Sequence, residues 1–229
     1  MGAVAERTGP AGAGVSYAMV LQQVRAAPPG KVFLFHGTPG VFRLSLSAAA
    51  HVLVSGVPIT LVDGTNRFDL YYIARYARRF SHSPRGARSG VTPEKVLDNI
   101  FISRAFTCYQ MEALVTDRLP AFARKLRSPL VIIFGLLDTF YDEQAPMFEV
   151  RRSLARIIGT LHRLKQQGFS VLLASVDVRS ASAERRSLFP SLASAMDRVY
   201  AVTEGEAGLN IRLETPPVRR ISAGGTERS

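Results

Sequence analysis

The chain has 229 residues, of which 47% are hydrophobic, and carries a formal net charge of +11. This length suits one sizeable domain, with or without tails, and no apolar stretch approaches the roughly 20 residues of a membrane span. The charge comes from 25 Arg and 4 Lys against 18 acidic residues, which favours polyanionic partners such as nucleic acid. A GC-rich genome, which inflates Arg and Ala together, would produce the same composition without such a partner.

Both ends of the chain have the composition of tails. Residues 1–29 are predicted to form a flexible N-terminal segment, with a short helix possible over 16–27. Residues 215–229 are predicted to form a flexible basic tail, which leaves 30–214 as the folded domain. The N-terminus lacks the basic end, apolar core and cleavage site of a signal peptide, so we expect a cytoplasmic protein with no membrane partner.

Between these ends, apolar strands alternate with helices. We predict strands over 31–37, 58–64, 129–137 and 169–177, and helices over 45–56, 67–80, 109–127 and 147–168. A short helix and a strand share 93–106, and an antiparallel pair closes the domain at 198–202 and 209–214. This alternation indicates an α/β fold with a mostly parallel central sheet, helices on both faces and a C-terminal antiparallel strand pair.

Some side chains have predicted positions within these elements. Pro120 is expected to break or kink the helix over 109–127, because proline lacks the amide hydrogen that a helix needs. Cys108 cannot form an intrachain disulfide, and its apolar neighbours predict burial. Val131, Ile132 and Ile133 are expected in a buried central strand. The helix over 147–168 is expected to bury an apolar face made by Phe148, Leu154, Ile157, Ile158, Leu161 and Leu164.

Three strings in this order of elements resemble the RecA/RadA recombinase family. "VDGTNRFDLYYIARYARR" (62–79) is similar to the family's second strand, acidic turn and following helix. "VLDNIFISRAFTCYQMEALV" (96–115) looks like the segment that passes through an Arg-Ala-aromatic strand into the next helix. "PLVIIFGLLDTFYDE" (129–143) resembles the strand that carries the Mg²⁺-coordinating Asp. The resemblance extends over about residues 30–214 and implies a RecA-like ATPase core.

The residues that would handle ATP in this family are altered. The string "GTPGVFRL" (37–44) has the layout of a phosphate-binding loop, but Phe42, Arg43 and Leu44 stand where the motif requires Gly, Lys and Ser or Thr. Phe134 falls at the position of the Mg²⁺-coordinating Asp. The water-activating Glu and the γ-phosphate-sensing Gln are also missing, and the nearest residue to that Gln is Val176. The loss of four distinct roles predicts that the protein does not hydrolyse ATP.

A residual site for ATP or ADP could still exist at this loop. A helix N-terminus with free amides binds anions, and the candidate residues are Gly37, Thr38, Pro39, Gly40, Arg43 and Ser45. The alternative is a plain tight turn. Mg²⁺ is not expected, and Asp138 is the weak candidate for a metal ligand. It belongs to an acidic group with Asp142, Glu143 and Glu149, for which a solvated turn is the alternative.

Two segments are candidates for DNA contact. The segment 178–197 falls where the recombinases carry a mobile DNA-contacting loop, and it offers Arg179, Arg185, Arg186 and Phe189. Arginine side chains with an interleaved aromatic ring suit single-stranded nucleic acid. The alternative is a solvated loop anchored by Phe189. A second basic segment, 74–88, holds five Arg and no acidic residue, and includes Arg78 and Arg79.

These observations support three hypotheses. The first is a non-hydrolysing RecA-like accessory protein in DNA repair or recombination, which binds DNA, a RecA-like partner or its own copies. The second is an unorthodox ATPase in which Arg43 replaces Lys and Asp138 holds the metal. The third is a regulatory scaffold that needs neither DNA nor hydrolysis. Tyr17 occupies the place of the aromatic residue through which recombinases polymerise, although its helix could instead pack on its own core.

Overall fold

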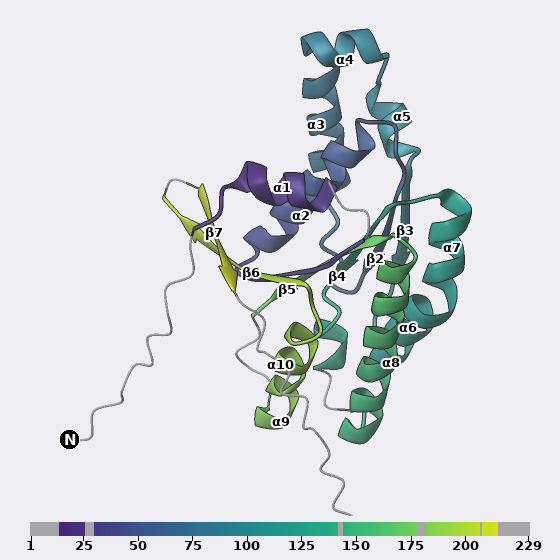
Figure 1. The fold of residues 1–229 in the computed structure, drawn as a ribbon, viewed down its shortest axis with the longest axis vertical. Helices are drawn as coiled ribbons and strands as arrows, with labels where there is room; N and C mark the ends of the chain where they lie inside the picture. The colour runs from purple at the N-terminus through teal and green to yellow at the C-terminus, as the bar shows by residue number, and fades with distance from the viewer. Residues whose placement is uncertain (1–13, 26–29, 142–143, 178–181, 207, 215–229) are drawn as a thin grey trace, which may run out of the picture.

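A seven-stranded sheet runs through the computed structural model, which describes residues 14–25, 30–141, 144–177, 182–206 and 208–214 (Figure 1). The spatial order of the strands is β3-β2-β4-β5-β1-β6-β7. Their bounds are Val32–Gly37 (β1), Ile59–Asp63 (β2), Ile100–Arg104 (β3), Leu130–Phe134 (β4), Ser170–Val176 (β5), Arg198–Gly205 (β6) and Gly208–Glu214 (β7). All neighbouring pairs are parallel except β6 and β7, which are antiparallel. The predicted α/β class and terminal antiparallel pair are therefore confirmed.

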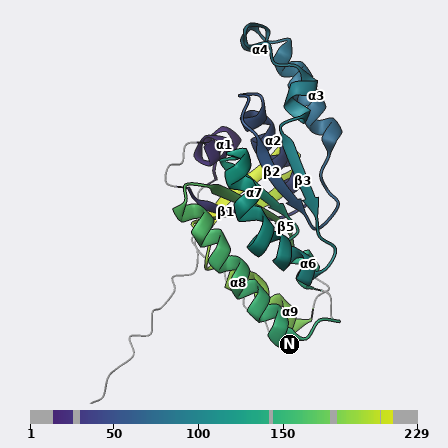
Figure 2. The ribbon, with the colours of Figure 1, turned by 90° about the vertical axis from the view of Figure 1, so that its right-hand side faces the viewer.

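Helices cover both faces of the sheet (Figures 1 and 2). On one side of the sheet lie α1 (Tyr17–Arg25), α2 (Gly40–Leu53), α3 (Leu70–Ser81) and α5 (Pro93–Leu97), with α4 (Pro84–Ser89) beyond the end of α3. On the other face lie α6 (Cys108–Ala113), the π-helix η1 (Leu114–Arg118), α7 (Leu119–Leu126), the 3₁₀-helix η2 (Asp138–Phe140), α8 (Met147–Gln166), α9 (Ala183–Arg186) and α10 (Leu188–Ala193). Each face has its own hydrophobic core.

The central strand β4 is buried on both sides, as predicted. Val131, Ile132 and Ile133 are fully inaccessible to solvent. Because side chains alternate along a strand, Ile132 joins the core beneath α2, whereas Val131 and Ile133 join the core that includes Ile157 and Leu161 of α8.

The buried face of α8 differs from the prediction at Phe148. Phe148 is 70% exposed, while Val150 takes part in the core. The reason is geometric: nine residues separate Phe148 from Ile157, which at about 100° per residue places them on opposite sides of the helix. Ile158 is only half-buried.

The helix predicted to break or kink at Pro120 does not break: its helical backbone continues from 108 to 126 but changes from α to π before Pro120. The predicted helix is divided into α6, the π-helix η1 and α7, with Pro120 in the first turn of α7. Cys108 is buried at the start of α6, as expected. The helix α1 buries Val20, Leu21 and Val24 against the chain's own core, which matches the alternative to a polymerisation role. No helix in the described ranges is long and apolar enough to cross a bilayer.

Candidate functional site

The connection between β1 and α2 consists of Thr38 and Pro39 alone. The Thr38 amide donates a hydrogen bond to the Val202 carbonyl over 2.9 Å, and its hydroxyl donates to the same oxygen over 3.3 Å. Gly37 has a φ of +127°, and a Cβ there would lie 2.2 Å from that carbonyl. Since Pro39 has no amide hydrogen, the loop offers few free donors to an anion.

The start of α2 is also covered. A Cβ at Gly40 would lie 2.5 Å from a side-chain carbon of Leu209, so the β6–β7 pair packs directly on the helix N-terminus. Ser45 is fully buried, and its hydroxyl donates to the Val41 carbonyl over 2.7 Å. Arg43 is exposed on the helix surface. The six candidate residues are therefore neighbours in space, but their polar groups do not converge on one point.

Two aromatic rings occupy the positions that the recombinase resemblance gives to nucleotide chemistry. Phe42 stands where the motif has its second Gly, and Phe134 stands where the family has its Mg²⁺-coordinating Asp. Their ring centroids are 5.1 Å apart in an edge-to-face arrangement, and the two side chains are 6% and 0% exposed. Edge-to-face aromatic pairs are favourable contacts. Both positions are thus part of the hydrophobic core, while nucleotide binding nearby stays a prediction.

Asp138 lies in η2, directly beyond β4. Burial raises the pKa of its carboxyl group, although the nearby Arg67 guanidinium opposes this rise. One oxygen, Oδ2, is buried without a hydrogen-bond partner. Within the described residues, no group of three His, Cys, Asp or Glu side chains is placed to hold a metal ion. Asp142 and Glu143 lie outside those residues, and Glu149 accepts a hydrogen bond from Tyr109 over 2.6 Å.

His36, at the end of β1, forms a cluster that sequence reasoning did not find. Its Nδ1 lies 3.1 Å from Asp177 Oδ1, and its Nε2 lies 2.9 Å from Glu214 Oε2. The ring also packs edge-on against Phe189, with centroids 4.8 Å apart. Burial by itself would lower the His36 pKa, but the two carboxylates outweigh it and raise the pKa above 6.5. Both ring nitrogens are committed to carboxylates, so the cluster suits a structural ion pair better than a nucleophile-activating base.

The His36 cluster predicts a pH-dependent stability. Because the folded pKa is raised, the stabilisation is fully present below pH 6.5 and is lost as the pH rises through the folded value. We therefore expect the difference in unfolding free energy between the native protein and His36→Gln to shrink as pH increases from 5.5 to 8.5. Urea titrations along a pH series measure it. The exposed His82, replaced in the same way, is the control, and a pH-independent difference for His36→Gln would contradict the prediction.

The segment 178–197 is only partly a surface feature. Arg179 lies outside the described residues. Arg185 is 4% exposed, and its guanidinium donates to the Phe140 carbonyl over 3.0 Å and to the Ala145 carbonyl. It therefore holds α9 against the loop around η2, which corrects its assignment as a DNA contact. Arg186 is exposed. Phe189 is half-buried and packs against the hydrophobic core, which agrees with the alternative of a loop that Phe189 anchors.

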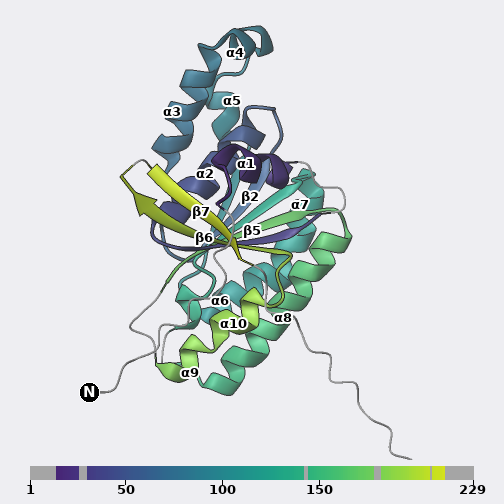
Figure 3. The same cartoon turned by 60° about the vertical axis from the view of Figure 1, so that its left-hand side comes forward.

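The second basic segment forms a projection. The helices α3 and α4 extend beyond the sheet, at the end of the molecule opposite α9 (Figures 1 and 3). Residues 70–92, which we call the basic projection, contain no acidic residue. All of its arginines are exposed, namely Arg75, Arg78, Arg79, Arg85 and Arg88. Nη2 of Arg75 lies 3.7 Å from Oδ2 of Asp69, so Arg75 forms an ion pair with the residue that caps the N-terminus of α3.

The basic projection is held together by local packing. Ser83 caps α4 by accepting a hydrogen bond from the Gly86 amide over 3.1 Å. A Cβ at Gly86 would lie 1.8 Å from the Phe80 carbonyl, so glycine lets α4 approach the end of α3 closely. The arginines are therefore displayed on an ordered pair of helices.

Comparison with known protein families found no family model that matches the chain, and comparison with curated proteins found no matching relative.

Proposed function

We propose that the protein is a non-hydrolysing RecA-like accessory protein that binds DNA through its basic projection. The observation that carries the proposal is the display of five exposed arginines, with no acidic residue among them, on helices that stand out from the sheet. Arginine clusters attract phosphate backbones regardless of sequence, and the release of counterions drives such binding. The net charge of +11 adds a long-range attraction of the same sign.

The non-hydrolysing part of the proposal is supported by the β1–α2 region. A catalytic phosphate site needs free backbone donors, a Lys and a metal ligand. The Thr38 amide is bound to Val202, and the Phe42–Phe134 contact occupies two of the key positions. The unorthodox ATPase is therefore the less favoured function. The role in DNA repair or recombination rests on the family resemblance.

Reversing three arginines of the basic projection is expected to weaken DNA binding strongly. In the variant Arg78→Glu, Arg79→Glu, Arg85→Glu, we expect at least a tenfold loss of affinity at low salt. The salt slope should fall by up to about 0.9 per lost phosphate contact on duplex DNA, or about 0.7 on single strands. Fluorescence anisotropy over a salt series measures both quantities.

The matched control reverses three exposed arginines of α8, Arg151, Arg152 and Arg163, which changes the net charge equally. Equal effects of the two triple variants would show that binding follows net charge and not the basic projection. No binding of the native protein to any nucleic acid at low salt would reject the proposal.

A partner-binding scaffold is the second candidate function. Tyr71 and Leu70, at the start of α3, are 75% and 45% exposed, and Phe106 is 73% exposed. Large exposed apolar side chains are common at protein interfaces. If DNA binding fails in the experiment above, a stable protein complex that is lost in Tyr71→Ser would support this function.

A further inference from the structure

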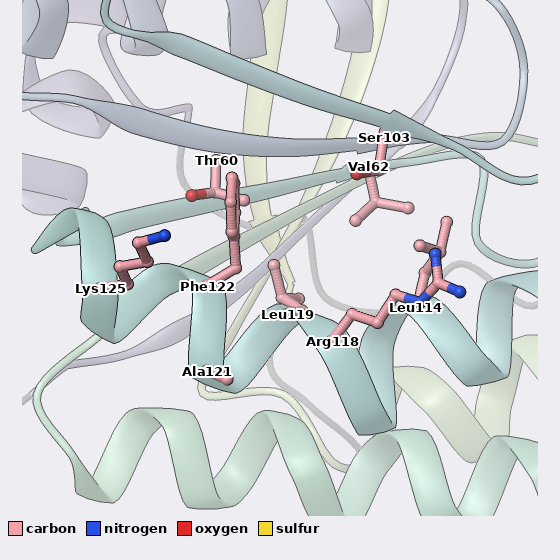
Figure 4. Close-up of a pocket in the computed structure, with 9 residues that line it drawn as sticks. All are labelled: Thr60, Val62, Ser103, Leu114, Arg118, Leu119, Ala121, Phe122 and Lys125. Atoms are coloured by element: carbon pink, nitrogen blue, oxygen red, sulfur yellow. The ribbon is translucent and has the colours of Figure 1, made fainter.

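A cavity of about 350 Å³ opens between the edge of the sheet and the helices that follow β3 (Figure 4). Its sheet side is formed by β2 and β3, and its helix side is formed by η1 and α7. The apolar wall consists of Val62, Leu114, Leu119 and Phe122. The Phe122 ring is fixed by an edge-to-face contact with Phe101, at 5.7 Å between centroids. The volume and the apolar lining match those of small-molecule sites.

The hydroxyl of Thr60 is the unexplained polar group of this cavity. Thr60 is 3% exposed, and its Oγ1 is buried without a hydrogen-bond partner. It lies on β2 beside Val62, on a face of the sheet that is otherwise packed with aliphatic side chains. Valine has nearly the same shape and would avoid the unsatisfied hydroxyl. Threonine therefore leaves an unused hydroxyl donor among the residues that line the cavity.

Two cationic side chains flank the cavity. Lys125 and Arg118 both belong to the lining, and in the view of Figure 4 Lys125 lies at the same end of the cavity as Thr60, with Arg118 beside Leu114 toward the other end. Both side chains are exposed at the rim. The described part of the chain supplies neither of them with a carboxylate partner. The local field is therefore positive, which favours an anionic group on the bound molecule.

The π-helix gives the helix side of the cavity its shape. η1 spans Leu114–Arg118, and α7 begins at Leu119, with Pro120 as its second residue. A π-turn is wider than an α-turn and often marks a functional position. Here it places Leu114 and Arg118, together with Leu119 of α7, along one wall (Figure 4).

We propose that this cavity binds a small organic carboxylate with an aromatic or short aliphatic body. The carboxylate accepts hydrogen bonds from the Thr60 hydroxyl and the Lys125 ammonium. The apolar body lies along Val62, Leu119 and Phe122, and Arg118 contributes a weaker attraction from the opposite end. The site is separate from the basic projection and does not depend on DNA binding.

Binding of 4-phenylbutanoate, compared with the neutral 4-phenylbutan-1-ol, tests the proposal. Titrations followed by amide chemical shifts give the affinities, and shifts in β2, β3 and α7 locate the site. We expect the carboxylate to bind about tenfold more tightly than the alcohol. Thr60→Val and Lys125→Gln should each weaken the carboxylate by about five- to tenfold, with little change for the alcohol.

Two further variants complete the experiment. Arg124→Gln, on α7 outside the cavity, removes a cation bonded to Gln167 and should leave both affinities unchanged. Ala121→Trp, at the exposed rim, should block both compounds while the protein stays folded. Equal binding of acid and alcohol, full retention of carboxylate affinity in Thr60→Val, or no shifts at millimolar concentration would each overturn the proposal.

Discussion

Replacing Arg185 by alanine is expected to lower the free energy of unfolding by about 3 kcal/mol or more, because each hydrogen bond to a charged group contributes roughly 1.5–3 kcal/mol. The guanidinium is buried and serves the carbonyls of Phe140 and Ala145. Alanine would leave both carbonyls without this donor. Chemical denaturation of the native and variant proteins measures the difference.

The neighbouring Arg186 is the matched control for this prediction. It lies on the same short helix but is exposed, so Arg186→Ala should change stability by less than about 1 kcal/mol. Equal effects of the two substitutions would contradict the structural role of Arg185.

Introducing the Gly, Lys and Thr of a phosphate-binding loop at positions 42–44 is expected to damage the fold without creating an ATPase. In Phe42→Gly, Arg43→Lys, Leu44→Thr, the loss of the Phe42 ring should alone cost about 3–5 kcal/mol. Glycine within a helix adds about 1 kcal/mol. Leu44 is fully buried, so threonine there would also bury a hydroxyl group. No Mg²⁺-dependent phosphate release should appear, because the Thr38 amide stays bonded to the Val202 carbonyl and the variant adds no carboxylate that could activate water.

The exposed Arg43 provides the control for the restored loop. Arg43→Lys alone should leave stability within about 0.5 kcal/mol of the native protein. Thermal denaturation and a phosphate-release assay are the two measurements. The prediction fails if the triple variant is as stable as the native protein. It also fails if the native protein shows robust Mg²⁺-dependent hydrolysis that Arg43→Ala abolishes.

The exposure of the arginines in the basic projection could be predicted from the sequence, whereas the burial of Phe148 was predicted wrongly. Arg78 and Arg79 were predicted as candidate DNA contacts because they lie in a basic segment without acidic residues, and both side chains are exposed. Phe148 was assigned to a buried face by proximity to apolar residues, although its angle on the helix excludes it. Periodicity is reliable only when each residue is placed by its rotation about the axis.

The sequence by itself determined the alternation of strands and helices and the disturbance of the regular α-helix near Pro120. These features depend on the spacing of apolar residues and on proline within short segments, so they can be predicted from neighbouring residues alone. Only the tertiary structure decided that Arg185 is buried, that His36 meets Asp177 and Glu214, and that Thr60 belongs to the lining of a cavity. Each of these contacts joins segments that are 40 to 178 residues apart or lie on different layers. Their meeting is set by the order of strands in the sheet, which brings distant chain segments to the same place.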